Sequence, residues 1–237
     1  MAKFKFEGNE YNYFTSTYND TRHNERAVEI ALAIDYVSKF RGCKILEVGN
    51  VLSNYLSFDH DIVDKYDKGK NIIKQDIVEY TTDKKYDLII SISTFEHIGW
   101  DSGGEGVAKG TGKIITALDH TKTLLAEVGT MLITLPLGYN SELDTLLKEK
   151  RIQFDKVFCM KRDEYNGWAQ IDLEDALKMD YSREGCYVGE YVNPEKDIRV
   201  GLITNYTRFL VVGFIYGKKE KKEYKAIFNT SMDSGIV

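Results

Sequence analysis

The sequence contains little that would tie the chain to a membrane or to a disulfide framework. Its three cysteines, Cys43, Cys159 and Cys186, stand far apart and form no CxxC pair. This spacing fits a reducing compartment and argues against a zinc site, so we expect small packing residues. No apolar run is long enough to span a bilayer, and residues 1–7 lack the apolar segment of a signal peptide. We therefore expect a cytoplasmic chain with no membrane partner.

Positive charge is also in short supply. The 237 residues carry 32 Lys and Arg against 37 Asp and Glu, a formal net charge of −5, which gives no general electrostatic reason to bind nucleic acid. Internal repeats and Pro- or Ser-rich linkers are absent. A chain that is 43% hydrophobic and 29% charged is typical of a globular protein. We expect one domain over 1–237, with an N-terminal cap and helix in 1–40 and a charged tail in 218–237.

Short apolar runs alternate with helix-like segments along the chain. The continuous run Tyr86–Ser93 is typical of a strand covered on both faces. Gly129 is expected to close one helix, Pro136 to end a strand, and Thr21 or Asn24 to cap the first helix. The alternation predicts an α/β fold with a mostly parallel sheet and helices on both faces. The expected strands are 44–48, 61–64, 71–73, 86–93, 131–135, 154–160 and 208–216, and the expected long helices are 21–40, 114–128 and 141–151.

Carboxylates stand at the ends of the first three expected strands. Glu47 with Gly49 follows the first, Asp64 ends the second, and Asp76 follows the third. In such sheets ligands bind outside the carboxyl ends of the strands. A carboxylate suits hydroxyl and amino groups: Asp64 could accept both ribose hydroxyls, and Asp76 the adenine amino group with Ile77 packed on the ring. Gly49 would let the backbone pass close to the ligand. The pattern favours an adenosine without a pyrophosphate, which indicates S-adenosylmethionine (SAM).

Phosphate-binding motifs fit poorly. Gly49 is followed by Asn50-Val51-Leu52-Ser53, so the GxGxxG of dinucleotide-binding folds is missing. The segment 110–114, GTGKI, resembles the end of a P-loop but lacks the upstream glycine and the Ser or Thr after lysine. A nicotinamide-dependent oxidoreductase is therefore an alternative that the sequence disfavours.

In order and spacing, these segments resemble a class I SAM-dependent methyltransferase. Glu47-Val48-Gly49 is similar to the start of its ExGxG motif, and Asp64 and Asp76 match the acidic residues of its second and third strands. Residues 87–91 match its fourth strand and residues 126–134 its passage from helix to fifth strand. Asn50-Val51 and Thr130 depart from the usual glycines.

Three further segments, 11–29, 95–101 and 135–140, are similar to a subgroup found among bacterial small-molecule and surface-polysaccharide modification enzymes. The resemblance is good over about 10–140. It implies a Rossmann-like, seven-stranded sheet with an antiparallel last strand, and SAM as cofactor with S-adenosylhomocysteine (SAH) as product.

The resemblance also implies roles for individual residues. His97 is the candidate general base, and Glu96 orients it or binds the acceptor; alternatively, His97 only binds substrate or caps a helix. A Mg²⁺ site formed by Glu96, His97 and His120 is a further alternative, although Ser93 stands where that pattern has another glutamate. The expected cofactor-binding residues are Glu47, Gly49, Asn50, Asp64, Lys65, Asp76, Ile77, Ser93 and Arg26.

The sequence gives fewer indications of the residues that bind the acceptor. Arg26, with Arg22 and Asn24, could clamp the methionine carboxylate or simply form a solvated helix face. The glycine-rich stretch 100–106 is either a substrate gate or a surface loop, and Trp168 is expected in the core. The expected substrate-binding residues are Trp100, Tyr139, Asn140 and Tyr13.

These residues suit a small polar acceptor. An oxygen of a sugar-like or phosphorylated metabolite is favoured, in capsule or surface-polysaccharide modification. A catalytically inactive methyltransferase fold that serves as a binding subunit remains an alternative.

Overall fold

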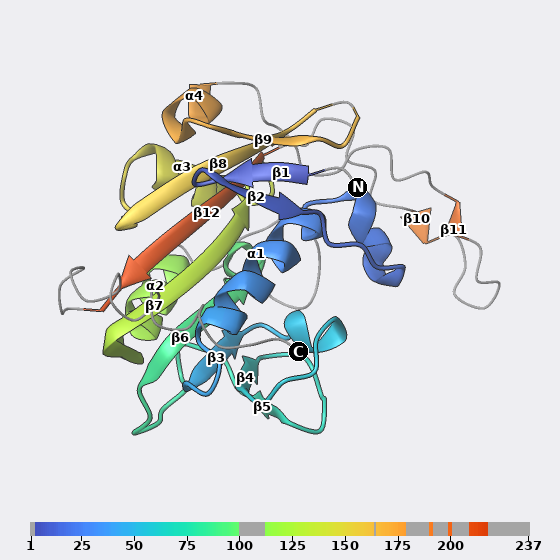
Figure 1. Ribbon diagram of the computed structural model, residues 1–237. Coiled ribbons are helices and arrows are strands. Elements are labelled where there is room, and N and C mark those ends of the chain that lie inside the picture. Colours follow the sequence, from blue (N-terminus) through green and yellow to red (C-terminus); the bar gives the residue numbers. More distant parts are fainter. Residues whose placement is uncertain are drawn as a thin grey trace.

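An eight-stranded mixed sheet forms the centre of the protein in the computed structural model (Figure 1), with strand order β5-β4-β3-β6-β7-β12-β8-β9. The structure describes residues 3–99, 112–163, 165–178, 190–191, 199–200 and 209–217. The sheet strands are β3 (Ile45–Val48), β4 (Asp61–Asp64), β5 (Ile72–Lys74), β6 (Tyr86–Ile92), β7 (Leu125–Pro136), β8 (Lys156–Arg162), β9 (Trp168–Ile171) and β12 (Phe209–Tyr216).

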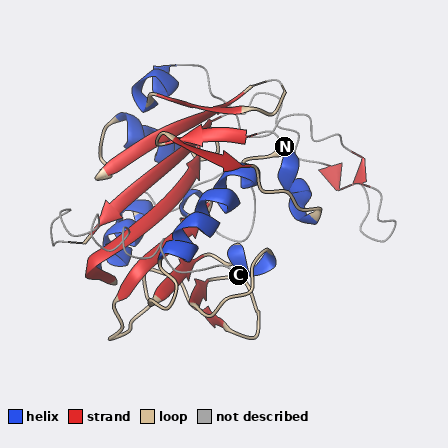
Figure 2. Cartoon of the chain, in the orientation of Figure 1, coloured by secondary structure: helices blue, strands red, loops and turns tan. Residues whose placement is uncertain are grey.

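Two short hairpins stand apart from this sheet: β1 (Lys3–Phe6) with β2 (Asn9–Asn12), and β10 (Glu190–Tyr191) with β11 (Arg199–Val200). Figure 2 colours the helices that flank the strands. These are the α-helices α1 (Arg26–Lys39), α2 (Lys113–Thr123), α3 (Ser141–Lys148) and α4 (Leu173–Lys178), and the short 3₁₀ segments η1 (Tyr18–His23), η2 (Leu52–Asn54) and η3 (Phe95–His97).

The strand directions follow the expected α/β pattern with one addition. Five strands pair in parallel, in the spatial order β5, β4, β3, β6, β7. The chain builds the sheet outward from β3, first through β4 and β5 on one side and then through β6 and β7 on the other, so the strand order reverses at β3. The last strand, β12, lies antiparallel between β7 and β8, as predicted. The predicted count of seven strands is wrong, because Trp168–Ile171 forms an eighth strand, antiparallel to β8.

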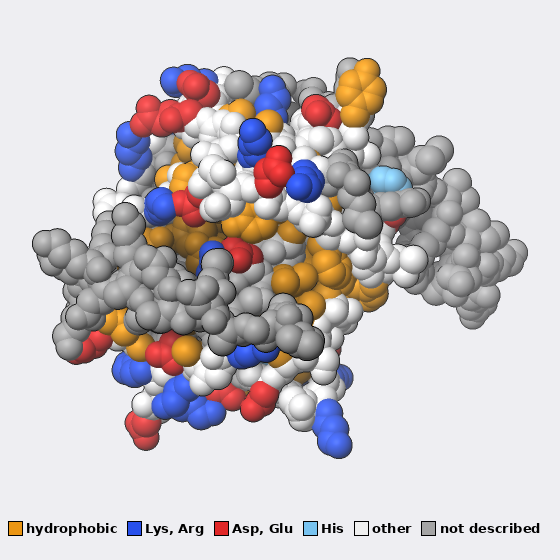
Figure 3. Space-filling model, in the orientation of Figure 1, with side chains coloured by type: hydrophobic (Ala, Val, Ile, Leu, Met, Phe, Trp, Pro, Cys, Tyr) orange, Lys and Arg blue, Asp and Glu red, His pale blue; other side chains and the backbone are white. Residues whose placement is uncertain are grey.

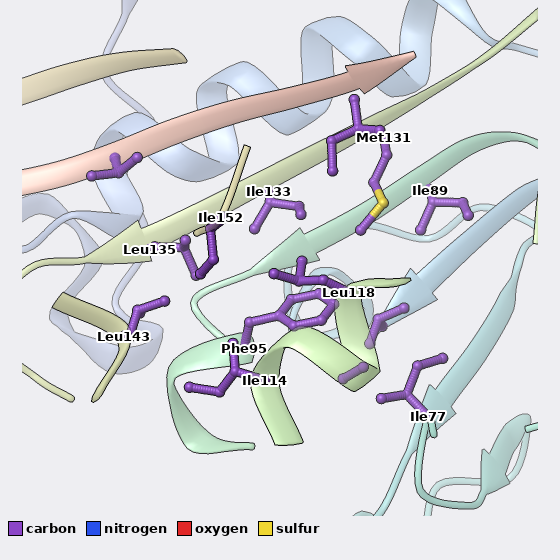
Figure 4. Packing of buried hydrophobic residues seen from close by; sticks show 14 of the residues in the cluster. Ile77, Ile89, Phe95, Ile114, Leu118, Met131, Ile133, Leu135, Leu143 and Ile152 are labelled. Atoms are coloured by element: carbon purple, nitrogen blue, oxygen red, sulfur yellow. The ribbon is translucent and has the colours of Figure 1, made fainter. Parts of the chain in front are cut away.

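Alternate side chains of the strands pack into two layers. On one face, Ile89, Met131 and Ile133 meet α2 and α3 (Figure 4). On the opposite face, Leu88 and Ile90 meet α1, and residues of β12 meet the β1–β2 hairpin. The period of two along each strand thus buries both faces, and helices cover both of them, as the sequence predicts.

Three predicted helices have the wrong bounds. The first begins at Arg26 rather than Thr21, because the 3₁₀ segment η1 ends at His23 and Asn24, with φ of −135° and ψ of −176°, is extended. Asn24 lies before this helix, where its Oδ1 accepts the N–H of Arg26 at 3.0 Å.

The second ends at Thr123, and the chain enters β7 at Leu125. Gly129 lies inside that strand, where a Cβ would come within 2.8 Å of the Tyr86 carbonyl oxygen. Leu125 pairs with Tyr86 of β6, and pairing resumes at Thr130 with Leu88 after a register shift, so strand pairing on either side overrides the helical pattern of 125–128. The helix predicted to reach Arg151 likewise ends at Lys148.

In the half of the sheet formed by β3, β4 and β5, the two connections between strands are fully described and contain no α-helix. The β3–β4 connection contains only η2 and loops, and the β4–β5 connection is a loop. Aromatic and aliphatic residues of the first connection, Tyr55, Leu56 and Phe58, pack against the core in place of a helix. Loops therefore surround the carboxyl ends of β3 and β4.

The described surface carries charges of both signs. On the face seen in Figure 3, Lys and Arg side chains are interspersed with Asp and Glu. In the part of the chain that the structure describes, no helix has both the length and the apolarity needed to cross a bilayer.

Asp144 on α3 provides a test of this packing. Its carboxylate accepts the N–H of Gly138, and burial raises its pKa from 3.8 to about 6. The native state therefore holds this proton longer than the unfolded state, so ionisation costs stability as pH rises from about 4 to about 6. We expect the unfolding free energy of Asp144→Asn, measured relative to wild type, to increase by about 2 kcal/mol from pH 4.5 to pH 8. Urea denaturation of both proteins at the two pH values measures this, and a pH-independent difference would contradict it.

Candidate functional site

A pocket of about 220 Å³ lies where β3, β4 and β6 end. This is the reversal point of the strand order, where ligands bind in open α/β sheets. Thr94 and Lys113 belong to its lining, together with sequence-predicted residues. Those predicted residues are Gly49, Asn50, Asp64, Lys65, Asp76, Ile77 and His97.

Glu47 is buried beneath the pocket and holds the loop that follows β3. Its Oε1 accepts the N–H groups of Val51 and Leu52 at 2.8 and 2.6 Å, and its Oε2 lies 2.8 Å from Nε2 of His60. Both carboxylate oxygens are thus engaged by the protein, so Glu47 shapes the loop. Sequence reasoning missed His60, because its contact with Glu47 depends on the β3–β4 register, which places Leu46 beside Asp61.

Gly49 makes the turn out of β3 possible. Its φ is +87°, and a Cβ at this position would lie 2.2 Å from Oγ1 of Thr94. Its N–H donates to the Val63 carbonyl at 2.9 Å, which ties the turn to β4. A larger residue would therefore be strained both in backbone and in packing.

Asp64 is held in a fixed orientation at the mouth of the pocket. Its Oδ2 accepts the N–H of Asn50 at 2.9 Å, and its Oδ1 accepts those of Tyr66 and Asp67, each at 2.8 Å. The Asn50 side chain donates to Asp67 at 2.6 Å. A carboxylate offers about four acceptor positions, so Asp64 keeps capacity to accept a further hydrogen bond.

Asp76 faces two lysines across the pocket. Its Oδ2 accepts from Nζ of Lys113 at 2.8 Å and lies 3.2 Å from Nζ of Lys65. Burial opposes the charge of Asp76, but the bonds from Lys113, the Val78 N–H and Lys65 hold its pKa below the ordinary value. Asp76 is therefore an ionised acceptor, and Ile77 beside it is almost fully buried.

Ser93 and Arg26 meet a buried carboxylate outside the pocket. Oε1 of Glu29 accepts the hydroxyls of Ser93 and Thr134 at 2.5 and 2.6 Å, and its Oε2 accepts from Nη1 of Arg26 at 2.6 Å. Ser93 takes a φ of +39° at the end of β6 to reach it. Glu29 was not predicted, because its apolar neighbours in α1 gave no sign that a carboxylate faces the sheet.

His97 and Glu96 lie on η3, directly after β6. The His97 side chain is 48% exposed, and its Nε2 lies 3.8 Å from Oε1 of Glu96. The His97 ring packs edge-on against Tyr139, with centroids 4.7 Å apart. Burial raises the pKa of Glu96 well above the ordinary range, and Glu29 adds to this while Arg26 opposes it. The pair thus combines an accessible imidazole with a buried carboxyl group.

Two further predicted residues, Asn140 and Tyr13, lie apart from the pocket. Asn140 caps α3 and donates to the Glu96 carbonyl at 2.7 Å, so its amide fixes η3. The Tyr13 hydroxyl accepts the N–H of the buried Trp168 at 2.8 Å, in the layer between the β1–β2 hairpin and β9. Trp100, with the stretch 100–106, lies outside the described residues.

The metal alternative finds no support in this part of the chain. His120 points its Nε2 at the Tyr80 carbonyl, 2.8 Å away. Among the described residues, no group of three or more His, Cys, Asp or Glu side chains is placed to hold a metal ion.

Comparison with known proteins gives only distant likenesses. No family model and no curated protein matches this chain. One similar solved structure is the N-methyltransferase NodS from Bradyrhizobium japonicum WM9, with 11% identity, covering 82% of this chain and 97% of that one, at a TM-score of 0.46. Another is a SAM-dependent methyltransferase from Archaeoglobus fulgidus, with 17% identity, covering 85% of this chain and 100% of that one, at a TM-score of 0.44. At these values the likeness assigns the chain neither a family nor an activity.

Proposed function

We propose that this protein is a SAM-dependent methyltransferase acting on a small polar acceptor. One observation carries the proposal. The N–H groups of the loop after β3, which would cradle a pyrophosphate in a dinucleotide-binding fold, are bonded to Glu47 and Asp64 instead. The pocket instead offers the carboxylates of Asp64 and Asp76, which suit the hydroxyls and amino group of adenosine.

The donor set fits SAM in chemical type. Asp64, fixed by three backbone N–H groups, would accept from a ribose hydroxyl at its remaining acceptor position. Asp76 would accept from the adenine amino group at the far side of the pocket, in exchange for part of its bonding to Lys113. SAM supplies an electrophilic methyl group on a sulfonium.

His97 takes the proton of the acceptor in this proposal. It lines the pocket wall next to Thr94, and half of its side chain is open to solvent. With SAM bound to supply the methyl group, the imidazole of His97 would take the proton that the acceptor hydroxyl loses. Asn140 and Tyr139 position η3, so the imidazole is held at the pocket mouth.

The acceptor class follows from the resemblance of 95–101 and 135–140 to enzymes of bacterial surface-polysaccharide modification. We therefore include in the proposal a hydroxylated, sugar-like acceptor in capsule or surface-polysaccharide synthesis. Charges of both signs on the described face favour such a small molecule over a polynucleotide.

Methyl transfer from labelled SAM tests the proposal. We expect label in products from pooled bacterial small metabolites, sugar nucleotides included, and none in tRNA, rRNA or protein. Calorimetric titration with SAH and NAD serves as the control, with binding of SAH alone expected. Strong labelling of RNA that falls steeply with salt would instead place the enzyme among nucleic-acid methyltransferases.

A further inference from the structure

We infer that the acceptor carries a cationic amino group and that Glu96 binds it. This rests on the proposed function and narrows its substrate class. The inference starts from an unusual atom: Oε2 of Glu96 is the one buried side-chain nitrogen or oxygen without a hydrogen-bond partner among the described residues. The residue is only 1% exposed, so bulk water does not reach this oxygen.

Glu96 lies beside the candidate base, although it is not itself among the residues that line the pocket. Glu96 is adjacent in sequence to His97, and its other oxygen lies 3.8 Å from Nε2 of that histidine. The Asn140 side chain donates to the main-chain oxygen of Glu96 at 2.7 Å, and this bond fixes the backbone of Glu96. A buried acceptor held this firmly beside the candidate base requires a donor, and a ligand is the partner that could supply one.

The surroundings of Glu96 decide which donor fits. Two more carboxylates, those of Glu25 and Glu29 at the start of α1, act electrostatically on it. Arg26 is the nearby cation, but its Nη1 donates to Glu29 at 2.6 Å. Arg162 donates to the His23 carbonyl at 2.9 Å. Were Glu96 ionised, three carboxylates would face Arg26 and Arg162, so its ionised form calls for one more positive charge.

A cationic amine meets both needs. It supplies N–H donors to the unpartnered oxygen and offsets the carboxylates, whereas a phosphate would be repelled by them. Burial raises the pKa of Glu96, which favours its neutral acid while no cation is bound. An amine that enters unprotonated takes that proton, and an ammonium–carboxylate pair forms. Amino sugars combine such a group with hydroxyls that His97 could deprotonate.

Ion-exchange fractionation of the acceptor pool tests this inference. Bacterial small metabolites are separated into cationic, neutral and anionic fractions, and each is incubated with the protein and labelled SAM. We expect label mainly in products from the cationic fraction. Glu96→Gln, which keeps the shape but not the charge, should lower this labelling at least tenfold at limiting acceptor. Glu149→Gln, at an exposed glutamate after α3, is the matched control and should leave it unchanged.

The outcomes separate this inference from the proposed function. Dominant labelling from the anionic or neutral fraction overturns the amine inference, as does cationic labelling that Glu96→Gln leaves unchanged. An absence of label from every fraction by a protein that binds SAH also counts against it. Failure to bind SAH defeats the proposed function itself. If Glu96→Gln does not fold, the fraction labelled by wild type decides the question.

Discussion

Replacing His97 with asparagine is expected to lower kcat by about 10²–10⁴ and to leave the affinity for SAH nearly unchanged. Asparagine keeps a polar side chain at the mouth of the pocket but cannot take the acceptor proton at neutral pH. The ring is half exposed, so its removal should cost little stability. Steady-state kinetics with the acceptor and calorimetry with SAH measure the two quantities on the same protein.

His120→Asn is the matched control. This histidine lies on α2 and bonds to the Tyr80 carbonyl, so its replacement should leave kcat unchanged. A variant at His97 that retains full kcat would remove the general-base role. If EDTA abolishes wild-type activity and Mg²⁺ restores it, His97 is instead a metal ligand.

Removing the Asp64 carboxylate should weaken SAH binding by at least tenfold. Each lost hydrogen bond to a charged group is worth about 1.5–3 kcal/mol, and about 1.4 kcal/mol corresponds to a factor of ten. Asp64→Ala also frees the N–H groups of Asn50, Tyr66 and Asp67, so the loop that forms the pocket wall loses its anchor. Calorimetric titration of SAH gives the change in affinity.

Asp59→Ala, at an exposed aspartate of the preceding loop, controls for general charge removal. Wild-type affinity in a protein carrying both Asp64→Ala and Glu47→Ala would show that the cofactor binds elsewhere. Glu47→Ala alone acts by a different route, because it releases Val51, Leu52 and His60 rather than a ligand contact.

The sequence predicted the strands near the pocket well, because a buried strand is an apolar run and its end is marked by polar residues. Asp64 and Asp76 could be placed at one edge on this basis alone. The partners of these carboxylates could not, since Lys113 is 37 residues from Asp76 and joins it only through the packing of α2.

The errors share a physical cause. The segment 125–128 has a helical pattern, but strand pairing on either side of it, Leu125 with Tyr86 and Thr130 with Leu88, decides its conformation. Glu29 and His60 were missed because their contacts join elements whose relative placement is set by the whole sheet. The local sequence pattern thus located the edge of the sheet that faces the ligand. The long-range contacts behind that edge could be identified only from the folded structure.

The absence of crossover helices around β4 and β5 has a consequence for how stability is distributed. β4 and β5 have only four and three residues, and strands backed by loops bury less surface than strands backed by helices. We therefore expect β4 and β5 to open locally at a lower free energy than the β6–β7–β12 core. A ligand held by Asp64 and Asp76 would bridge two of these weakly supported strands. Part of its binding free energy would then be spent on ordering them, and occupancy of the pocket would be coupled to the rigidity of one edge of the sheet.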